Sequence, residues 1–495
     1  MGNKMMKPIY IFLLLPLSLV TAQTDDLDEL FDDPDSGLIE EAVVMDKPEE
    51  SIFSGDKFIW AGDITSTMGM KYGFTELAPN TDKLLDGTER LTVKIGAKLW
   101  FDARPDKNFR VFGKFTTDYP FSTKIKSLAD PSKPFGPDNQ VSTAILNNIK
   151  IFELFSDFNY EEKIFFRFGK QTAAWGLSRF YQIADPITVG VKDPQDPTAD
   201  LEGPLALKVA LPLGVNNLYF YSVMKESYIP SNPLESSLRD LGIGLKADFL
   251  IPIPKNGILG NGEFTVGGYY QRNQAPKAIA GLSTSVGNFQ IFTDQAMSWG
   301  LDSYRLSNET VLLDLDGGGP SPSKQINLTE KTTEGIFYSA TAGTMYVNND
   351  WHFTLYGEYM YNSAGSPDEK YLSKWAETQA AETLGFLTNK TLIFSDLFGY
   401  LSQHNSGLSL SLSELFGSDK LGASTLWLQN WVDRSGMSTT TLSFKPFDHV
   451  VLEGGATLAW GEDVTEWVIK NYDPVTKGPR RLAGFINFKL GAGRF

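Results

Sequence analysis

The sequence predicts an all-β fold, a transmembrane antiparallel β-barrel of about 18 strands, with 16 as the alternative count. Apolar and polar side chains alternate with a period of two after residue 56, the pattern of strands with one apolar and one polar face. Several runs reach about nine residues, the length that a tilted strand needs to cross a bilayer, whereas strands of soluble proteins more often have about five or six. Short and long connections alternate between the runs, as in barrels of outer membranes.

The first 22 residues have the pattern of a cleaved signal peptide. Lys4 and Lys7 precede an apolar core from Ile9 to Val20, and residues 20–22 (VTA) form a small-residue cleavage site. The core is too short to span a membrane as a helix, which needs roughly 20 residues. The absence of cysteine excludes a lipoprotein anchor, disulfides and thiolate metal sites. We therefore expect export in a diderm bacterium.

Residues 23–55 are expected to be a disordered periplasmic leader, followed by the barrel at residues 56–495. The leader is rich in aspartate and glutamate and lacks sustained periodicity. It contributes much of the net charge of -16, and a negative balance gives no support to nucleic-acid binding. The carboxylates lack the spacing of an EF-hand calcium loop.

The alternating runs follow one another from residue 58 onward. In residues 91–102, aliphatic side chains and phenylalanine alternate with threonine, lysine, tryptophan and aspartate. A tight turn follows, and the alternation resumes at residue 109, which predicts a hairpin. The aromatic content of 13% is expected to form girdles at the two lipid–water boundaries. Comparable strands are expected at residues 58–72, 109–118, 164–171, 241–251, 264–270, 351–361, 408–412 and 450–460.

The connections are expected to form a rim of short periplasmic turns and a rim of long external loops. An even number of strands follows if both termini are periplasmic. The short turns are expected at residues 104–108, 160–163, 213–217, 347–350 and 445–449, and the long loops at residues 119–146, 176–203, 304–333, 363–394 and 461–480.

One external loop, residues 366–384, has the pattern of a helix. Pro367 suits the first helical position, and Asp368 and Glu369 supply acids in the first turn. Two placements remain open: a surface helix on the external loop, or a helix folded into the barrel as a constriction.

The C-terminal residues 481–495 form an amphipathic closing strand. Ile486, Phe488 and Leu490 make its apolar face, and the chain ends on Phe495. Such a strand is typical of outer-membrane barrels, whose insertion machinery reads the aromatic end. Phe495 falls on the face opposite to Ile486, one step out of the usual register.

Signatures of catalysis are scarce, so we expect neither an enzyme nor a cofactor or metal. The chain has three histidines: His352 and His449 are expected beside short turns, and His404 in a loop. None is spaced to share a metal with another, and no nucleophile, zinc or phosphate-loop motif is present.

Charged side chains fall on the polar face of the early strands, where they would line the barrel. Rings of charge inside a pore are an ordinary source of solute selectivity. For any single residue, pairing with a neighbouring opposite charge explains its position as well as contact with a solute does. The predicted pore-lining side chains from this pattern are Lys94, Lys98, Arg110, Lys114, Arg167, Lys208, Lys246 and Glu358.

The strand that starts at Lys163 and its following loop carry a family resemblance. The stretch resembles an element of phosphate- or alginate-selective outer-membrane porins and related barrel families, through Arg167, Gly169, Lys170, Gln171, Trp175, Gly176, Ala184, Asp185 and Pro186. The resemblance implies that the Trp175–Gly203 loop folds inward as a constriction. It also implies solute contacts at Arg167, Gln171 and Arg179.

Together, these observations favour a porin-like channel through which small polar or anionic solutes diffuse across the outer membrane. The expected partners are membrane lipid, the insertion machinery at the closing strand and the solute, and the protein would be a monomer or a trimer. Two alternatives remain: a fatty-acid-type hydrophobic transporter, which would need an apolar N-terminal plug, and a surface adhesin or structural protein anchored by its barrel.

Overall fold

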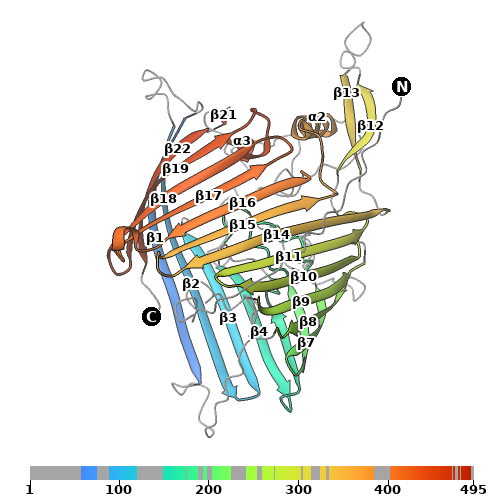
Figure 1. Ribbon diagram of the computed structural model, residues 1–495, viewed down its shortest axis with the longest axis vertical. Coiled ribbons are helices and arrows are strands. Elements are labelled where there is room, and N and C mark those ends of the chain that lie inside the picture. The colour runs from blue at the N-terminus through green and yellow to red at the C-terminus, as the bar shows by residue number, and fades with distance from the viewer. Residues whose placement is uncertain are drawn as a thin grey trace.

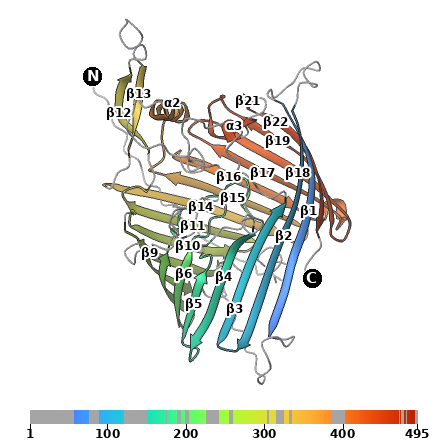
Figure 2. The ribbon, with the colours of Figure 1, turned by 180° about the vertical axis from the view of Figure 1, so that it is seen from behind.

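The protein is an 18-stranded closed β-barrel (Figures 1 and 2). A computed structural model describes residues 57–74, 88–119, 149–173, 175–187, 193–197, 203–224, 241–253, 259–272, 274–302, 305–313, 324–330, 334–383, 402–470, 472–473, 478–479 and 481–491. The expected signal peptide, the acidic leader and Phe495 lie outside these residues.

The strands of the barrel follow chain order around the ring, and each pairs antiparallel with its neighbours. β1 pairs with both β2 and β22, which closes the ring. The predicted count of 18 is therefore confirmed, and so is the porin-like barrel as a fold. The barrel strands are β1 Phe58–Phe74, β2 Thr88–Asp106, β3 Phe109–Tyr119, β4 Ile149–Tyr160, β5 Ile164–Lys170, β6 Leu205–Leu213, β7 Asn216–Met224, β8 Leu241–Ile251, β9 Leu259–Tyr270, β10 Lys277–Val286, β11 Phe289–Trp299, β14 Ile336–Asn348, β15 Phe353–Asn362, β16 His404–Leu412, β17 Leu421–Asn430, β18 Gly436–Phe447, β19 Val450–Trp460 and β22 Leu482–Gly491.

The period-two pattern places apolar side chains on the outside of the ring. In β22, Ile486, Phe488 and Leu490 are exposed, whereas Asn487 and Lys489 point inward beside Glu453 of β19. Large exposed hydrophobic side chains recur on the same face of nearly every strand. An apolar outer band of this kind is the lipid-facing surface of a transmembrane barrel. The predicted multi-pass outer-membrane topology agrees with it.

The two rims differ as predicted. Short turns join the strands at residues 107–108, 161–163, 214–215, 349–352 and 448–449. The other rim carries the hairpin β12 (Arg305–Leu313) and β13 (Lys324–Glu330), the helices α2 (Tyr371–Thr383) and α3 (Glu466–Lys470), and the short pair β20 (Tyr472–Asp473) and β21 (Gly478–Pro479) (Figure 1). The 3-10 turn η5 (Leu415–Gly417) lies between β16 and β17, on the short-turn rim.

The predicted helix is confirmed as α2, at the loop rim. Trp375 and Tyr371 are buried there, and the Thr378 hydroxyl donates a hydrogen bond to the Asn327 carbonyl of β13 at 2.9 Å. This contact supports the placement on the external loops. No described helix has both the length and the apolar character needed to cross a membrane.

The long connection expected at residues 304–333 joins β11 to β14 and contains the hairpin β12–β13, which contacts α2. One expectation about local structure was wrong. His404 is the first residue of β16 instead of a loop residue, and its Nδ1 atom lies 2.6 Å from the Tyr359 hydroxyl.

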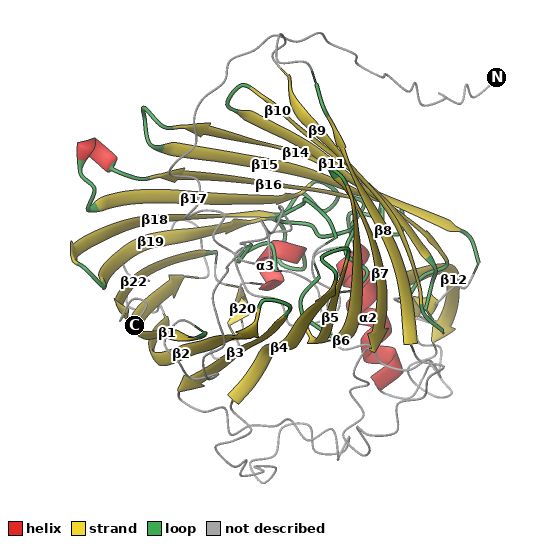
Figure 3. Cartoon of the chain, turned by 90° about the horizontal axis from the view of Figure 1, so that it is seen from below, coloured by secondary structure: helices red, strands yellow, loops and turns green. Residues whose placement is uncertain are grey.

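Part of the barrel interior is packed with protein. Loop segments lie inside the ring of strands (Figure 3). The connection between β5 and β6 forms two buried apolar clusters there with inward-facing strand residues. The first cluster contains Phe180, Tyr181, Phe292, Met345, Tyr356, Met360, Leu428, Met437, Ala459 and Trp467, and the second Ala173, Trp175, Ala184, Ile187, Ala206, Tyr221, Val223, Tyr269 and Ile279.

Candidate pore and its lining

The described part of the β5–β6 connection that lies inside the ring, residues 171–173 and 175–187, is called here the inner segment. Trp175 packs against β8 and β9, where a Cβ atom at Gly244 would come within 2.9 Å of the indole ring. Phe180 packs against β16, where a Cβ atom at Gly407 would come within 2.6 Å of the phenyl ring. Glycine on the barrel wall thus makes room for both aromatic rings, and the segment reaches the far wall.

Asp294 of β11 holds the middle of the inner segment. Its carboxylate accepts hydrogen bonds from the amides of Leu177 at 2.7 Å and Ser178 at 2.8 Å, and from the Ser178 hydroxyl at 2.6 Å. Asp294 is 1% exposed. Backbone amides removed from water need acceptors, and a carboxylate is a strong one, so this side chain stabilises the inward path of the segment.

Glu358 of β15 holds the next three residues in the same way. Its carboxylate accepts hydrogen bonds from the amides of Arg179, Phe180 and Tyr181 at 2.9, 3.1 and 2.9 Å. The Tyr356 hydroxyl also donates to it. Two wall carboxylates therefore bind five consecutive backbone amides, and we call Asp294 and Glu358 the carboxylate clamp. The inward loop implied by the family resemblance is present.

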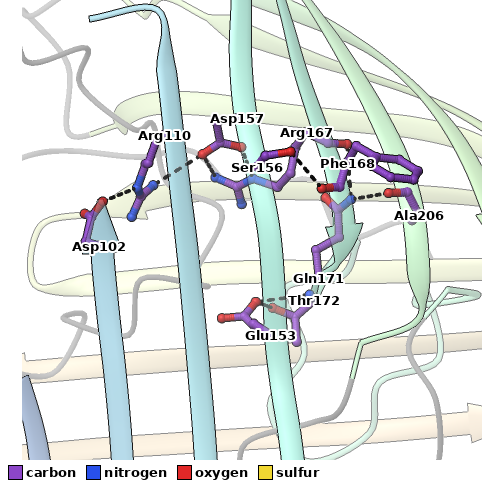
Figure 4. Close-up of polar contacts among 10 residues, drawn as sticks. All are labelled: Asp102, Arg110, Glu153, Ser156, Asp157, Arg167, Phe168, Gln171, Thr172 and Ala206. Carbon is purple, nitrogen blue, oxygen red and sulfur yellow. Dashed lines mark hydrogen bonds and ion pairs between the residues drawn. The ribbon is translucent and has the colours of Figure 1, made fainter. Parts of the chain in front are cut away.

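The opposite arc of the wall carries a chain of alternating charges, called here the ionic wall (Figure 4). Arg110 lies between Asp102 at 3.0 Å and Asp157 at 3.4 Å. Arg167 binds the same Asp157 at 2.7 Å, and its guanidinium lies 4.1 Å from the centre of the Phe155 ring. Arg110, Asp157 and Arg167 occupy paired positions on β3, β4 and β5. Asp102 of β2 pairs with Phe112 and lies diagonally across from Arg110, so all four charges meet on one face.

The ionic wall continues onto β6, β7 and β8. Lys208 and Lys246 lie 5.1 and 5.6 Å from the Tyr219 ring centre, and Lys246 also pairs with Asp248 at 3.1 Å. Lys98 and Lys114 occupy inward positions on β2 and β3, in register with Thr116 and Trp100. Lys94 occupies a position on the same face of β2 as Lys98, and its side chain lies outside the described part of the structure.

Three predicted contact residues belong to the inner segment or its anchor. Gln171 is 1% exposed and donates to the Ala206 carbonyl at 2.8 Å (Figure 4). Glu358 is 4% exposed and belongs to the carboxylate clamp. Arg179 places its guanidinium 5.5 Å from the Tyr356 ring centre. The alternation predicts that Gln171 and Glu358 face solvent, but both side chains are buried and hydrogen-bonded to the protein. Solute contact at these residues stays a prediction.

The beginning of the inner segment is fixed by Glu153 of β4. Its carboxylate accepts hydrogen bonds from the Thr172 amide at 3.2 Å and hydroxyl at 2.8 Å (Figure 4). The sequence pattern singled out neither Glu153 nor Asp294. Neither position has a local signal, because an acid on the polar face of a strand looks the same whether it faces water or a loop.

At the loop rim, a buried polar cluster joins α2, α3 and the β17–β18 connection. Asp433 is 6% exposed and accepts hydrogen bonds from the amides of Glu466 at 2.8 Å and Ser435 at 2.9 Å. Burial raises the pKa of the Asp433 carboxyl. Asn430 donates to the Tyr371 hydroxyl at 3.0 Å and to the Glu466 carboxylate at 2.8 Å. The cluster holds both helices over the barrel.

Comparison with solved structures finds bacterial proteins of similar extent. The outer membrane protein OpdK of Pseudomonas aeruginosa aligns with a TM-score of 0.43 and 7% identity over 88% of this chain and 99% of that one. OpdL of the same organism aligns with 0.44 and 9% over 89% and 99%. OmpF of Salmonella typhi, in complex with daunomycin, aligns with 0.39 and 8% over 88% and 97%. No family model and no curated protein matches the chain.

Proposed function

We propose that this protein is an outer-membrane channel through which small polar solutes diffuse, with a preference for anions. The observation that carries the proposal is the ionic wall. Charged side chains inside a transmembrane barrel are stable where water reaches them, because an ion without water or partners is costly. Arg110 and Asp157 keep about a quarter of their side-chain surface exposed, at 24% and 26%, in agreement with a water-filled passage beside them.

The preference for anions rests on the sign of the wall. Among the described inward side chains of β2–β8, cations outnumber acids, and a local excess of positive charge raises the concentration of anions nearby. The cations are Lys98, Arg110, Lys114, Arg167, Lys208 and Lys246, and the acids Asp102, Glu153, Asp157 and Asp248.

Planar-bilayer recording tests both parts of the proposal. The purified barrel should conduct ions, and a salt gradient should give a zero-current potential of the sign for anion preference. Lys94→Glu with Lys98→Glu should shift this potential toward cation preference. Lys163→Glu, in an exposed turn with a side chain 73% accessible, is the matched control and should leave it unchanged.

Three outcomes separate the alternatives. A barrel that never conducts would overturn channel function and favour a surface adhesin or structural protein. A conducting barrel whose zero-current potential ignores the double variant would overturn the ionic wall as the filter. Passage of fatty acids without ion conductance would favour the hydrophobic transporter.

A further inference from the structure

A group of unpartnered hydroxyls lies on the inner face of β16, β17 and β18, near the short-turn rim. Ser411, Ser424 and Thr441 occupy consecutive paired positions across the three strands. Ser443 lies two residues beyond Thr441 on β18 and pairs with Glu453 of β19. We call Ser411, Ser424, Thr441 and Ser443 the hydroxyl shelf.

The shelf faces open space. Its four residues line a cavity of about 240 Å³ together with Lys445, Glu453 and residues 412–414 and 419–423, which include Glu414, Asp419 and Lys420 of the β16–β17 turn. Ser411 and Ser424 are exposed, and Thr441 and Ser443 are half-buried. Ser411 points inward because its strand neighbours Leu410 and Leu412 occupy the alternate face. The shelf is therefore accessible from the lumen.

The four hydroxyls make no hydrogen bond with any other described residue. Elsewhere on the same strands, hydroxyls do pair: Thr439 and Thr457 lie 3.0 Å apart on the inner face, and Thr425 and Thr440 lie 3.1 Å apart on the outer face. The shelf thus leaves its donors and acceptors available where neighbouring threonines use theirs on each other.

The chemistry of the shelf suits one class of solute. Each hydroxyl can both donate and accept, so the shelf matches a molecule whose own groups also do both. A fully ionised anion such as sulfate only accepts, and an ammonium group only donates. Glu453 pairs with Lys489 at 2.6 Å, and the other charged side chains that line the cavity are two acids and two cations, Glu414, Asp419, Lys420 and Lys445, so no sign of charge dominates. Hydroxyls on paired strands stand about 5 Å apart, a spacing that several hydroxyls of one sugar ring can meet together.

The shelf also lies across the ring from the ionic wall. β16, β17 and β18 are separated from β5, β6 and β7 by half of the barrel order. A solute that passes between these arcs meets charge on one side and free hydroxyls on the other.

From these observations we propose that the hydroxyl shelf is a binding subsite for polyhydroxylated, sugar-like solutes. The inference deepens the channel proposed above and rests on it. Each hydrogen bond that replaces one to water adds little net free energy, so four hydroxyls give weak, reversible binding. Weak binding suits a channel because the solute must also leave.

The test is the concentration of glucose that half-blocks the ion current of single channels in planar bilayers. The quadruple variant Ser411→Ala, Ser424→Ala, Thr441→Val and Ser443→Ala should raise this concentration about tenfold or more. The matched control is Thr425→Val with Thr440→Val, on the outer face of the same strands, which should leave it unchanged. The zero-current potential should stay the same in both variants, because the ionic wall is intact.

The outcomes distinguish this inference from the proposed function. The channel could conduct and prefer anions while glucose fails to block it, or while glucose blocks it equally before and after the quadruple change. Either result would overturn the binding subsite and would not contradict the proposed channel function. A barrel that conducts no ions would overturn both. Should the quadruple variant fail to fold, as judged by its mobility on unheated gels, the pair Ser411→Ala with Ser424→Ala gives the same comparison with an expected rise of about threefold.

Discussion

The β11–β15 wall and the β16–β18 wall adjoin each other in the barrel and treat their polar side chains in opposite ways. On the first, Asp294 and Glu358 are almost fully buried and bind five amides of the inner segment. On the second, the hydroxyl shelf faces the cavity and binds no described residue. One wall holds the protein in place, and the other remains available to a solute.

The difference follows from access to water. A polar group that a loop covers must find a partner within the protein, because an unsatisfied buried group costs about 1–3 kcal/mol. A hydroxyl in the lumen can bind water until a solute replaces it. Side chains of one polar face can therefore serve structure or binding according to what packs over them.

The largest expected effect comes from breaking the clamp. Glu358→Ala leaves the amides of Arg179, Phe180 and Tyr181 without their acceptor, at a cost of about 1–3 kcal/mol for each amide that stays buried. The inner segment should then leave the β15 wall, and the single-channel conductance should rise severalfold.

The matched control is Glu263→Ala on β9, where the carboxylate accepts one long hydrogen bond, 3.4 Å from the Ser283 hydroxyl. Its conductance should stay near that of the unchanged protein. Equal conductance in all three proteins would mean that the clamp does not determine the width of the passage.

A smaller effect should come from crowding one aromatic ring of the inner segment. Gly407→Val would place a Cβ atom within 2.6 Å of the Phe180 ring, and overpacking of this kind costs about 1–3 kcal/mol. The ring should shift while the clamp persists, so the conductance should change less than in Glu358→Ala. Gly454→Val on β19, whose Cβ atom would have no neighbour closer than 3.9 Å, is the control. If the conductance of the control changed as much, the effect would come from valine in a barrel strand and not from displacement of the Phe180 ring.

The smallest effect concerns the buried polar cluster at the loop rim. Like the carboxylate clamp, it contains a buried carboxyl group, that of Asp433, but it lies outside the membrane-spanning strands. Because burial raises the pKa of Asp433, the native state binds this proton more tightly than the unfolded chain. Between the ordinary carboxyl range and the raised value, the free energy of unfolding should therefore fall as pH rises. Asp433→Asn should flatten that part of the profile, measured by urea unfolding in lipid vesicles. The same slope in both proteins would contradict the assignment.

Much of the fold could be predicted from the sequence because the strands of a barrel have a regular alternation of apolar and polar residues. The run at residues 241–251 is strand β8 and that at residues 450–460 is β19, with the predicted boundaries. The lipid-facing side of each strand had to be apolar, so every second side chain could be assigned to a face without knowledge of its neighbours. The hairpin β12–β13 escaped prediction because it lies beyond the membrane, where that constraint ends.

The candidate site was predictable only in part. The inward direction of Arg110 and Arg167 followed from the alternation, and their shared partner Asp157 followed once the register of β3, β4 and β5 was known. Asp294 could not be found in this way, since its partner Leu177 is 117 residues away. Gln171 looked like a lumen residue, but it is buried at the start of the inner segment and donates to the Ala206 carbonyl.

By itself, the amino-acid order determined a closed ring with an apolar exterior and a polar inner face, because a two-residue period and the bilayer leave strands little other choice. Only the tertiary structure decided which inner-face groups hold the protein together and which remain open to a solute. That decision depends on where one loop packs. The loop is held through its backbone amides, and because every residue except proline has one, the sequence does not indicate which amides a carboxylate will bind.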